Sequence, residues 1–219
     1  MSETSFTPAL GRLLPSRFFD VVAALVREKV WRPMVVRSAA VRPGDLVVDV
    51  GCGTGTLVLM LHEAEPAAWV VGVDPDPEIL ARAQRKAGGG LAGVEWRQGM
   101  GDELAEVVGA EVADVVVSSL VLHQCPVPVK RAILAAMYAV LRPGGRLVIA
   151  DYGLQRTWVM RLAFRIVQLA DGKADTQPNA DGILPSLIAG AGFEEVCEVE
   201  VVPTVTGSIS VLTAYRPML

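Results

Sequence analysis

Short apolar runs and stretches of helical spacing alternate along most of the chain. Each run is rich in valine or other apolar residues and is bounded by glycine, proline or charged residues, as buried strands are. The predicted strands span residues 47–50, 68–74, 94–98, 113–120 and 145–153. The predicted helices between them span residues 56–65, 77–87 and 128–141, with a short polar helix before residue 113. The chain is therefore expected to fold as successive βαβ units.

The predicted strands are apolar on both faces, which is typical of a parallel sheet covered by helices on both sides. The C-terminal pattern differs from this. Residues 182–193 are predicted to form a helix that ends at a glycine, and residues 194–202 and 207–215 two strands joined by a short turn. Strands that follow one another this closely pair antiparallel. The pattern predicts an α/β fold with a mostly parallel sheet and a C-terminal antiparallel hairpin.

Two further segments flank the predicted sheet. Residues 16–40 have helical spacing with an expected break near Pro33, and they belong to an N-terminal helical cap over residues 1–42. Residues 155–178 form an insertion before the C-terminal helix and hairpin. No repeat, linker or low-complexity tract divides the chain, so a single domain of residues 1–219 is predicted.

The bulk composition limits what the protein can be. Hydrophobic residues make up 52% of the chain, but charged residues, glycine or proline interrupt every apolar run before it could span a membrane. The N-terminal residues show no long apolar signal region, so a cytoplasmic protein is expected. The net charge of -4 removes the simplest electrostatic reason to expect a nucleic-acid partner. Three widely separated cysteines and two histidines support neither a disulfide framework nor a metal site.

The stretch VVDVGCGTGTL, residues 47–57, places three glycines between the first predicted strand and the first predicted helix. Glycines at such a turn let a ligand approach the backbone at the positive end of the helix. The spacing G-x-G-x-G differs from the G-x-G-x-x-G of dinucleotide-binding turns, and no Gly-Lys-Ser/Thr of a phosphate loop is present. A short-chain dehydrogenase would need Tyr-x-x-x-Lys, but arginine occupies that lysine position after Tyr138 and Tyr152. Neither a phosphate loop nor such a dehydrogenase fits the pattern.

A carboxylate, Asp74, ends the second predicted strand. A carboxylate at this place in an α/β fold can accept both hydroxyl hydrogens of an adenosine ribose. The alternative is a turn residue, because the sequence Asp-Pro-Asp-Pro that begins at Asp74 is typical of turns. Taken together, the glycine turn and the strand-end carboxylate favour the ribose.

Four sequence blocks occur along the chain: VVDVGCGTG, VVGVDPDPEIL, ADVVVSSLVLHQCP and LRPGGRLVIADYG. In their order and spacing they resemble the class I S-adenosylmethionine-dependent methyltransferases, in particular the small-molecule branch that includes ubiquinone and menaquinone methyltransferases. The resemblance extends over about residues 19–215. It implies a Rossmann-like, seven-stranded sheet whose last strands form the hairpin, and S-adenosyl-L-methionine as the cofactor.

The resemblance also implies roles for individual residues. It places Asp49 and the glycine turn near the methionine portion, Asp74 on the ribose, and the loop after the third strand around the adenine. The residues assigned to cofactor binding are Asp49, Gly51, Gly53, Gly55, Asp74, Pro75, Gly99, Met100, Gly101 and Ser119. Where many relatives have Gly-Asp-Ala, this chain has Gly-Met-Gly at residues 99–101, followed by Asp102. Met100 can pack on the adenine but cannot accept a hydrogen bond from its amine, so Asp102 is the expected substitute in a rearranged loop.

Transfer of a sulfonium methyl group needs alignment, exclusion of water and, for some acceptors, removal of a proton. His123 and Tyr152 are the candidate catalytic residues, because His123 follows the fourth predicted strand and Tyr152 lies at the end of the fifth, both at the carboxyl edge of the predicted sheet. The alternative for His123 is a structural hydrogen bond to a loop carbonyl. Asp151 is expected to hold a loop or a helix end, and Cys52 to fill space in the glycine turn.

The residues after the fourth predicted strand bear on the methyl acceptor. DNA amino-methylating enzymes have Asn/Asp-Pro-Pro-Tyr there, whereas this chain has Ser-Ser-Leu-Val at residues 118–121. Cytosine C5 enzymes use a cysteine after proline, whereas Cys125 precedes Pro126, and no separate target-recognition segment is present. A small, apolar acceptor is therefore predicted. A methyltransferase acting on a lipid or protein, and a cofactor-binding module without catalysis, are the alternatives.

Residues 155–172 (QRTWVMRLAFRIVQLADG) carry more apolar surface than packing on a sheet should bury. Arg161 and Arg165 fall on one narrow stripe at helical spacing, and apolar residues cover most of the remaining circumference. Full burial or a homodimer contact would account for this surface. The alternative is an apolar lid over the acceptor site, in peripheral contact with a membrane whose phosphates face the arginines. The side chains assigned to this lid are Phe18, Phe19, Trp31, Trp158 and Phe164.

Overall fold

The computed structural model describes residues 27–218 of the chain. Within this part, one sheet contains β1 (Leu46–Val50), β2 (Trp69–Asp74), β3 (Val94–Gln98), β4 (Ala113–Ser119), β5 (Leu141–Tyr152), β6 (Glu194–Thr204) and β7 (Gly207–Tyr215). Their order across the sheet is β3-β2-β1-β4-β5-β7-β6. Pairing is parallel from β3 to β5, whereas β7 is antiparallel to both β5 and β6. The predicted seven-stranded, mostly parallel α/β sheet with a C-terminal antiparallel hairpin is confirmed.

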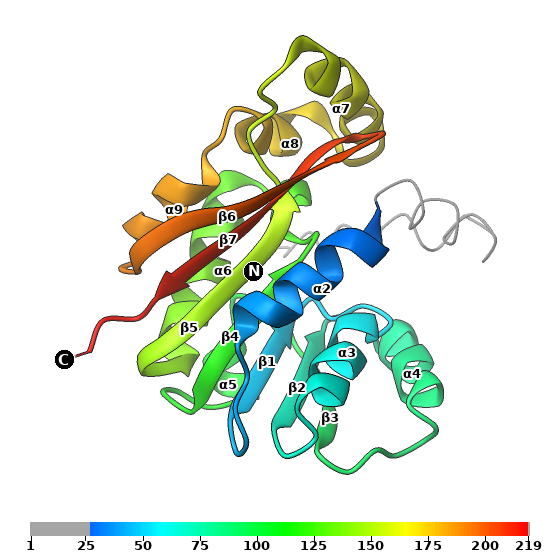
Figure 1. Ribbon diagram of the computed structural model, residues 1–219, viewed down its shortest axis with the longest axis vertical. Coiled ribbons are helices and arrows are strands. Elements are labelled where there is room, and N and C mark those ends of the chain that lie inside the picture. The colour runs from blue at the N-terminus through cyan, green and yellow to red at the C-terminus, as the bar shows by residue number, and fades with distance from the viewer. Residues whose placement is uncertain (1–26, 219) are drawn as a thin grey trace, which may run out of the picture.

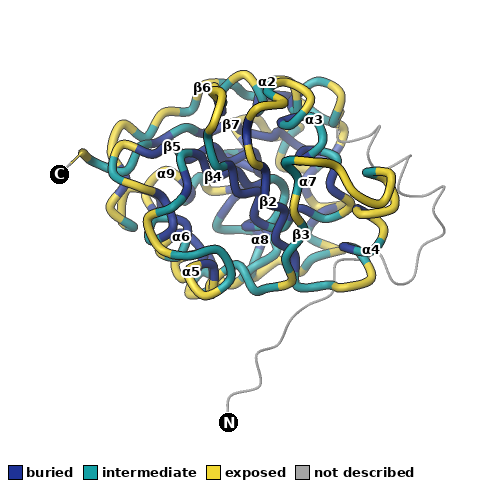
Figure 2. The backbone as a smooth tube through the Cα atoms, turned by 90° about the horizontal axis from the view of Figure 1, so that it is seen from below, coloured by how far each residue is buried: buried dark blue, intermediate teal, exposed yellow. Residues whose placement is uncertain are grey.

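The helices cover both faces of this sheet. They are α2 (Glu28–Ala39), α3 (Thr56–Ala64), α4 (Pro77–Lys86), α5 (Leu104–Val107), the 3-10 helix η2 (Leu122–Gln124), α6 (Val127–Val140), α7 (Trp158–Asp171), α8 (Lys173–Ala180) and α9 (Leu184–Gly190). One core cluster joins residues of α2, α3, α4 and α7 to the sheet, and the other joins α5, α6 and α9 to its opposite face (Figure 1). Alternate residues of β1 divide between them, with Val47 in the first and Val48 in the second. Much of the sheet is therefore buried between helices (Figure 2).

The predicted boundaries agree best with the structure for the short strands and the helices between them. β1 to β4 and α3 to α4 lie within a few residues of their predicted spans. The junction at residue 141 differs, because α6 ends at Val140 and β5 already begins at Leu141, which pairs with Ala113. The Arg-Pro-Gly-Gly sequence that follows indicates a turn, so the sequence placed the start of this strand too late.

The break predicted near Pro33 is wrong for the described residues, because α2 continues from Glu28 through Pro33 to Ala39. A proline inside a helix removes one backbone hydrogen bond. Burial compensates for this loss, since Trp31, Val35 and Ala39 are fully buried against the sheet. The rest of the predicted N-terminal helix, including Phe18 and Phe19, lies outside the described residues.

The insertion at residues 155–178 forms α7 and most of α8, which lie together beyond the carboxyl end of β5 (Figure 1). Thr157 caps α7 by accepting a hydrogen bond from the backbone N–H of Met160. Phe164 and Val167 bury one side of α7 in the core. Among the helices of residues 27–218, none combines the length and the hydropathy that a membrane span requires.

Candidate functional site

The three glycines of the turn after β1 have positive φ angles of 71° at Gly51, 54° at Gly53 and 73° at Gly55. Backbone of this kind favours glycine. A Cβ atom at Gly51 would collide with Val121, and one at Gly55 with Trp96. At Gly53, by contrast, a Cβ atom would meet nothing within 4 Å. The middle glycine therefore faces open space, while the outer two allow close packing.

Asp74, the last residue of β2, holds this turn in place. Its Oδ2 accepts a hydrogen bond from the backbone N–H of Gly53 at 2.9 Å, and its Oδ1 accepts one from Asp76 at 3.0 Å. Burial raises the pKa of Asp74 above its ordinary value, although these two backbone hydrogen bonds act in the opposite direction. Carboxylate oxygens can each accept more than one hydrogen bond, so both retain capacity for a ligand.

Asp49 is the last but one residue of β1 and is completely buried. Within the described residues, neither of its carboxyl oxygens has a hydrogen-bond partner. Burial raises its pKa to about 7, and the nearby Arg32 guanidinium opposes this rise. Arg32 itself pairs with Glu28 at 2.8 Å, while its buried Nε has no partner among the described residues. A buried acid and a partly unpaired guanidinium thus lie beside the glycine turn, and unpartnered groups of this kind are costly unless a ligand satisfies them.

A cavity of about 540 Å³ opens at the carboxyl ends of β1, β2 and β4. It is lined by Glu28, Arg32, Val50, Gly51, Cys52, Gly53, Thr54, Thr56, Val73, Asp74, Pro75, Asp76, Ile79, Gly99, Met100, Gly101, Asp102, Ser119, Leu120, Val121, Gln124, Cys125, Pro126, Val129 and Ile133. Eight of the residues assigned to cofactor binding are in this lining, and the other two, Asp49 and Gly55, are not. Ligands of open α/β sheets bind at this edge of the sheet.

The loop after β3 forms one wall of the cavity. Met100 and Asp102 both line it, next to the apolar side chains of Val129 and Ile133 from α6. The sequence could not decide whether Asp102 reaches the site. Its presence in the lining makes a carboxylate available where Met100 replaces the expected acid.

His123, in η2, does not line the cavity. Its Nδ1 lies 2.7 Å from Asp151 Oδ1 and its Nε2 lies 3.5 Å from Asp171 Oδ2. Burial lowers its pKa, but the Asp151 and Asp171 carboxylates together outweigh burial and raise the pKa to about 9. At neutral pH this histidine is therefore an imidazolium that donates to Asp151 and faces the Asp171 carboxylate, so it has no free nitrogen to accept a proton. Its predicted catalytic role stays a prediction, which would require Asp171 to move away.

Tyr152 is also absent from the cavity lining. Its hydroxyl group lies 2.8 Å from Thr206 Oγ1, and its ring packs between His123 and Phe164. Burial raises its pKa to about 12, so the hydroxyl group stays protonated at neutral pH. Asp151 performs the loop-holding role expected of it, because it also accepts the backbone N–H of Leu122 at 2.7 Å.

Sequence reasoning missed Lys130, a fully buried lysine of α6. Its Nζ donates to Leu122 O at 2.7 Å, Asp175 O at 2.8 Å and Asn179 Oδ1 at 2.8 Å. The ammonium group therefore joins η2 to α8. Arg32 and Glu28 were missed as well, because only the packing of α2 on the sheet brings them to the cavity. The described residues contain no cluster of three or more His, Cys, Asp or Glu side chains that could hold a metal ion.

The comparisons with known proteins agree with this geometry. Residues 47–145 match a family model described as a methyltransferase domain. In sequence and fold the chain is similar to the class I S-adenosylmethionine-dependent methyltransferases, among them enzymes of quinone biosynthesis. The cofactor of this class is S-adenosylmethionine.

Two curated relatives and one solved structure illustrate the match. The chain is 32% identical to an arsenite methyltransferase of Halobacterium salinarum over 72% of its own length and 39% of that relative. It is 35% identical to a demethylmenaquinone methyltransferase of Thermus thermophilus over 62% of its own length and 60% of that relative. The crystal structure of the S-adenosylmethionine-dependent methyltransferase SibL has a TM-score of 0.70 at 20% identity, covering 91% of this chain and 58% of that one. The chain thus spans less than two thirds of both relatives.

Proposed function

We propose that the protein transfers a methyl group from S-adenosylmethionine to a small, apolar acceptor. The observation that carries this proposal is the pair of unsatisfied groups, Asp49 and the Arg32 Nε, beside a glycine turn whose middle residue, Gly53, faces open space. The amino-acid end of S-adenosylmethionine carries an ammonium and a carboxylate. These charges are complementary to Asp49 and Arg32 respectively.

The remaining lining residues fit the other parts of the cofactor. The carboxylate of Asp74 is the group that would accept hydrogen bonds from the ribose hydroxyls. Met100, Val129 and Ile133 offer apolar surface to the adenine, and Asp102 offers an acceptor for its amine. When bound, the cofactor supplies a methyl group already activated by the sulfonium. The protein therefore needs only to align the reactants and exclude water.

The apolar nature of the acceptor is inferred from the cavity wall beside the glycine turn. Leu120, Val121 and Pro126 line the cavity there, and the nearby Cys125 thiol has a pKa raised to about 11 by burial. A neutral thiol and apolar side chains favour a substrate without charge. One relative is named for its action on demethylmenaquinone, an apolar molecule, which supports this choice. A lipid acceptor, a protein acceptor or a cofactor-binding module without catalysis are the alternatives.

Calorimetric titration with S-adenosylhomocysteine tests the cofactor half of the proposal, and saturable one-to-one binding is expected. Transfer of a radiolabelled methyl group to extracted metabolites tests the other half. Label in the organic phase of the extract would support an apolar acceptor. Cofactor binding without any labelled product would indicate the binding module, and label in protein would indicate a different acceptor class.

We further propose a single domain, a cytoplasmic location and a mobile lid formed by the insertion at residues 155–178. No residue of this insertion lines the cavity in the described conformation. The lid proposal is supported indirectly, because Lys130 and the contact between Asp171 and His123 join α7 and α8 to η2, next to cavity residues Gln124 and Cys125. A homodimer contact through the same insertion is the alternative.

A further inference from the structure

The helix α7 buries one apolar side and exposes another. Besides the buried Phe164 and Val167, five large apolar side chains are open to solvent. They are Trp158 (76% exposed), Val159, Leu162, Ile166 and Leu169 (88% exposed), and we call them the α7 stripe. Their spacing places them on one face of the helix. The excess apolar surface expected from the sequence is confirmed, and the described part of the chain leaves it uncovered.

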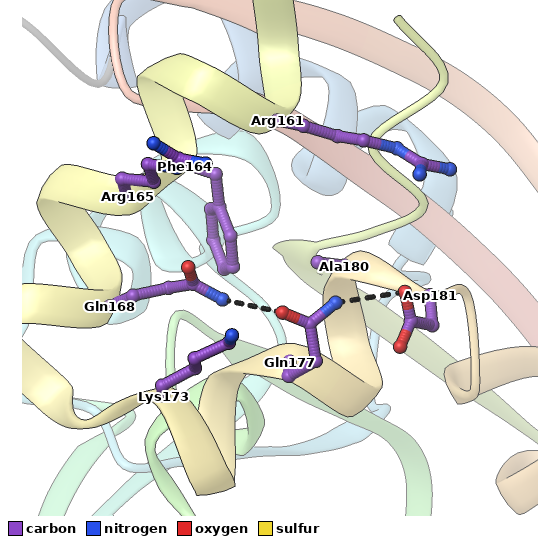
Figure 3. Close-up of a pocket in the computed structure, with 8 residues that line it drawn as sticks. All are labelled: Arg161, Phe164, Arg165, Gln168, Lys173, Gln177, Ala180 and Asp181. Atoms are coloured by element: carbon purple, nitrogen blue, oxygen red, sulfur yellow. Dashed lines mark hydrogen bonds between the residues drawn. The ribbon is translucent and has the colours of Figure 1, made fainter. Parts of the chain in front are cut away.

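A cleft of about 160 Å³ lies between α7 and α8. Its lining consists of Arg161, Phe164, Arg165, Gln168, Lys173, Gln177, Ala180 and Asp181 (Figure 3). The one carboxylate in this lining, Asp181, accepts a hydrogen bond from Gln177 at 2.9 Å. Within residues 27–218, neither Arg165 nor Lys173 has an ion-pair partner. The cleft therefore presents unneutralised positive charge.

The charge on α7 itself has one sign over most of its length. From Trp158 to Ala170 its charged residues are both arginines, and Asp171 at its end faces His123. Arg165 follows Leu162 by three positions and precedes Leu169 by four, so it borders the α7 stripe directly. A band of positive charge thus runs along one edge of an exposed apolar face.

We infer that α7 docks on the surface of an anionic lipid bilayer, an interaction that goes beyond the proposed methyl transfer. The α7 stripe enters the boundary between headgroups and acyl chains, while Arg165 and Lys173 face lipid phosphates. Trp158, in the first turn, suits the headgroup level because its indole is amphipathic. Charge complementarity favours this partner over a second copy of the chain. A symmetric contact between two α7 helices would bring like charges together at the edge of the shared face.

Co-sedimentation of the full-length protein with vesicles tests this inference. We expect binding to vesicles of phosphatidylcholine mixed with phosphatidylglycerol, and much weaker binding to phosphatidylcholine alone. The double variant Arg165→Gln/Lys173→Gln should bind the mixed vesicles about 25-fold more weakly, because each basic residue at an anionic surface contributes about a factor of five. The matched control is Arg85→Gln/Arg131→Gln, which removes two exposed positive charges from α4 and α6. This control should bind like the wild type.

Two further variants test the apolar part of the contact. Leu169→Glu should abolish vesicle binding without changing the melting temperature, since this side chain is 88% exposed. Trp158→Ala should remove the blue shift of tryptophan fluorescence that the mixed vesicles cause. Trp69→Ala is its matched control, because Trp69 is also exposed but lies at the start of β2. That variant should keep the shift.

Four results would contradict membrane docking by α7 or assign the α7 stripe to another occupant. The inference is wrong if the wild type fails to bind the mixed vesicles, or if Leu169→Glu binds as well as the wild type. A lower melting temperature of Leu169→Glu in the absence of vesicles would show that the chain itself covers the face. A drop in its molecular mass by ultracentrifugation would assign the face to a second copy. Titration with S-adenosylhomocysteine should be unaffected by these variants, so that failure of docking and failure of the proposed function remain distinguishable.

Discussion

The carboxylate of Asp74 accepts the backbone N–H of Gly53 at 2.9 Å and so joins the end of β2 to the turn after β1. A single side chain therefore supports the turn and lines the cavity at the same time. The two interpretations of Asp74, as a turn residue and as a ribose-binding residue, therefore describe two uses of one carboxylate. Substitution of Asp74 must consequently be judged by affinity and stability together.

Asp74→Ala should weaken the binding of S-adenosylhomocysteine by about tenfold to a hundredfold, because hydrogen bonds to a charged group contribute about 1.5–3 kcal/mol each. Calorimetry gives the dissociation constant, and circular dichroism shows whether the fold persists. Asp45→Ala is the matched control, since Asp45 also accepts a backbone N–H, from Arg42 at 2.8 Å, but does not line the cavity. An unchanged dissociation constant in Asp74→Ala would remove this residue from the site.

Gly53→Val should abolish cofactor binding, because the added side chain would occupy the open space beside the turn. Its φ of 54° also makes the substitution costly for stability, by about 1 kcal/mol or more. Gly44→Val separates these two effects. Gly44 has a φ of 85°, meets nothing within 4 Å and does not line the cavity. Similar melting temperatures with lost binding only at Gly53 are expected, whereas retained binding in Gly53→Val at low temperature would restrict this glycine to shaping the turn.

The pair of His123 and Asp151 predicts a pH dependence of stability. The pKa of His123 rises from 6.5 to about 9 on folding, so its contribution is complete below pH 6.5 and is lost as the pH rises toward 9. Denaturant titrations at several pH values should show an unfolding free energy that falls over this range by about 1–3 kcal/mol. His123→Gln should flatten the curve. An equal slope in this variant and in the wild type would mean that the imidazolium does not form.

The sequence determines much of this fold locally. Valine-rich runs and the positive φ angles required at Gly51 and Gly55 depend on residues close together in the chain, so they can be predicted. The same holds for Asp74, whose place follows from the end of a strand. The adenine wall could be predicted only in part, because the role of Asp102 depends on how its loop folds.

The remaining features depend on distant contacts. The burial of His123 between Asp151 and Asp171 requires η2, β5 and α7 to meet, and no spacing in the sequence signals that. From the sequence alone, a single histidine after a strand is therefore as consistent with a catalytic base as with a buried ion pair. Likewise, α2 continues through Pro33 because the helix is buried against the sheet. This burial outweighs the local tendency of proline to interrupt a helix.

Arg32→Met tests the assignment of the methionine carboxylate. This variant should bind S-adenosylhomocysteine about tenfold more weakly, because one charge-assisted hydrogen bond is lost. Its affinity for 5′-methylthioadenosine, which lacks the amino-acid portion, should stay within about twofold of the wild type, since that ligand offers Arg32 no charge to pair with. Arg37→Met, an exposed position on the same helix, is the matched control. An equal loss of affinity for both ligands would mean that Arg32 supports the cavity without contacting the carboxylate.

The unpartnered carboxyl of Asp49 makes cofactor binding depend on pH. Its pKa is raised to about 7, so near neutrality a large fraction is protonated and uncharged. A ligand ammonium group binds the carboxylate form, so the affinity for S-adenosylhomocysteine should increase as the pH rises through 7, by at most about tenfold per unit because one proton is released. Calorimetry in buffers of different ionisation enthalpy measures that proton directly. Asp49→Asn keeps the shape of the side chain but cannot ionise, and it should bind weakly with no proton released near pH 7. If this variant released the same number of protons as the wild type, the pH dependence would belong to another group, and Asp49 would not be the partner of the ammonium.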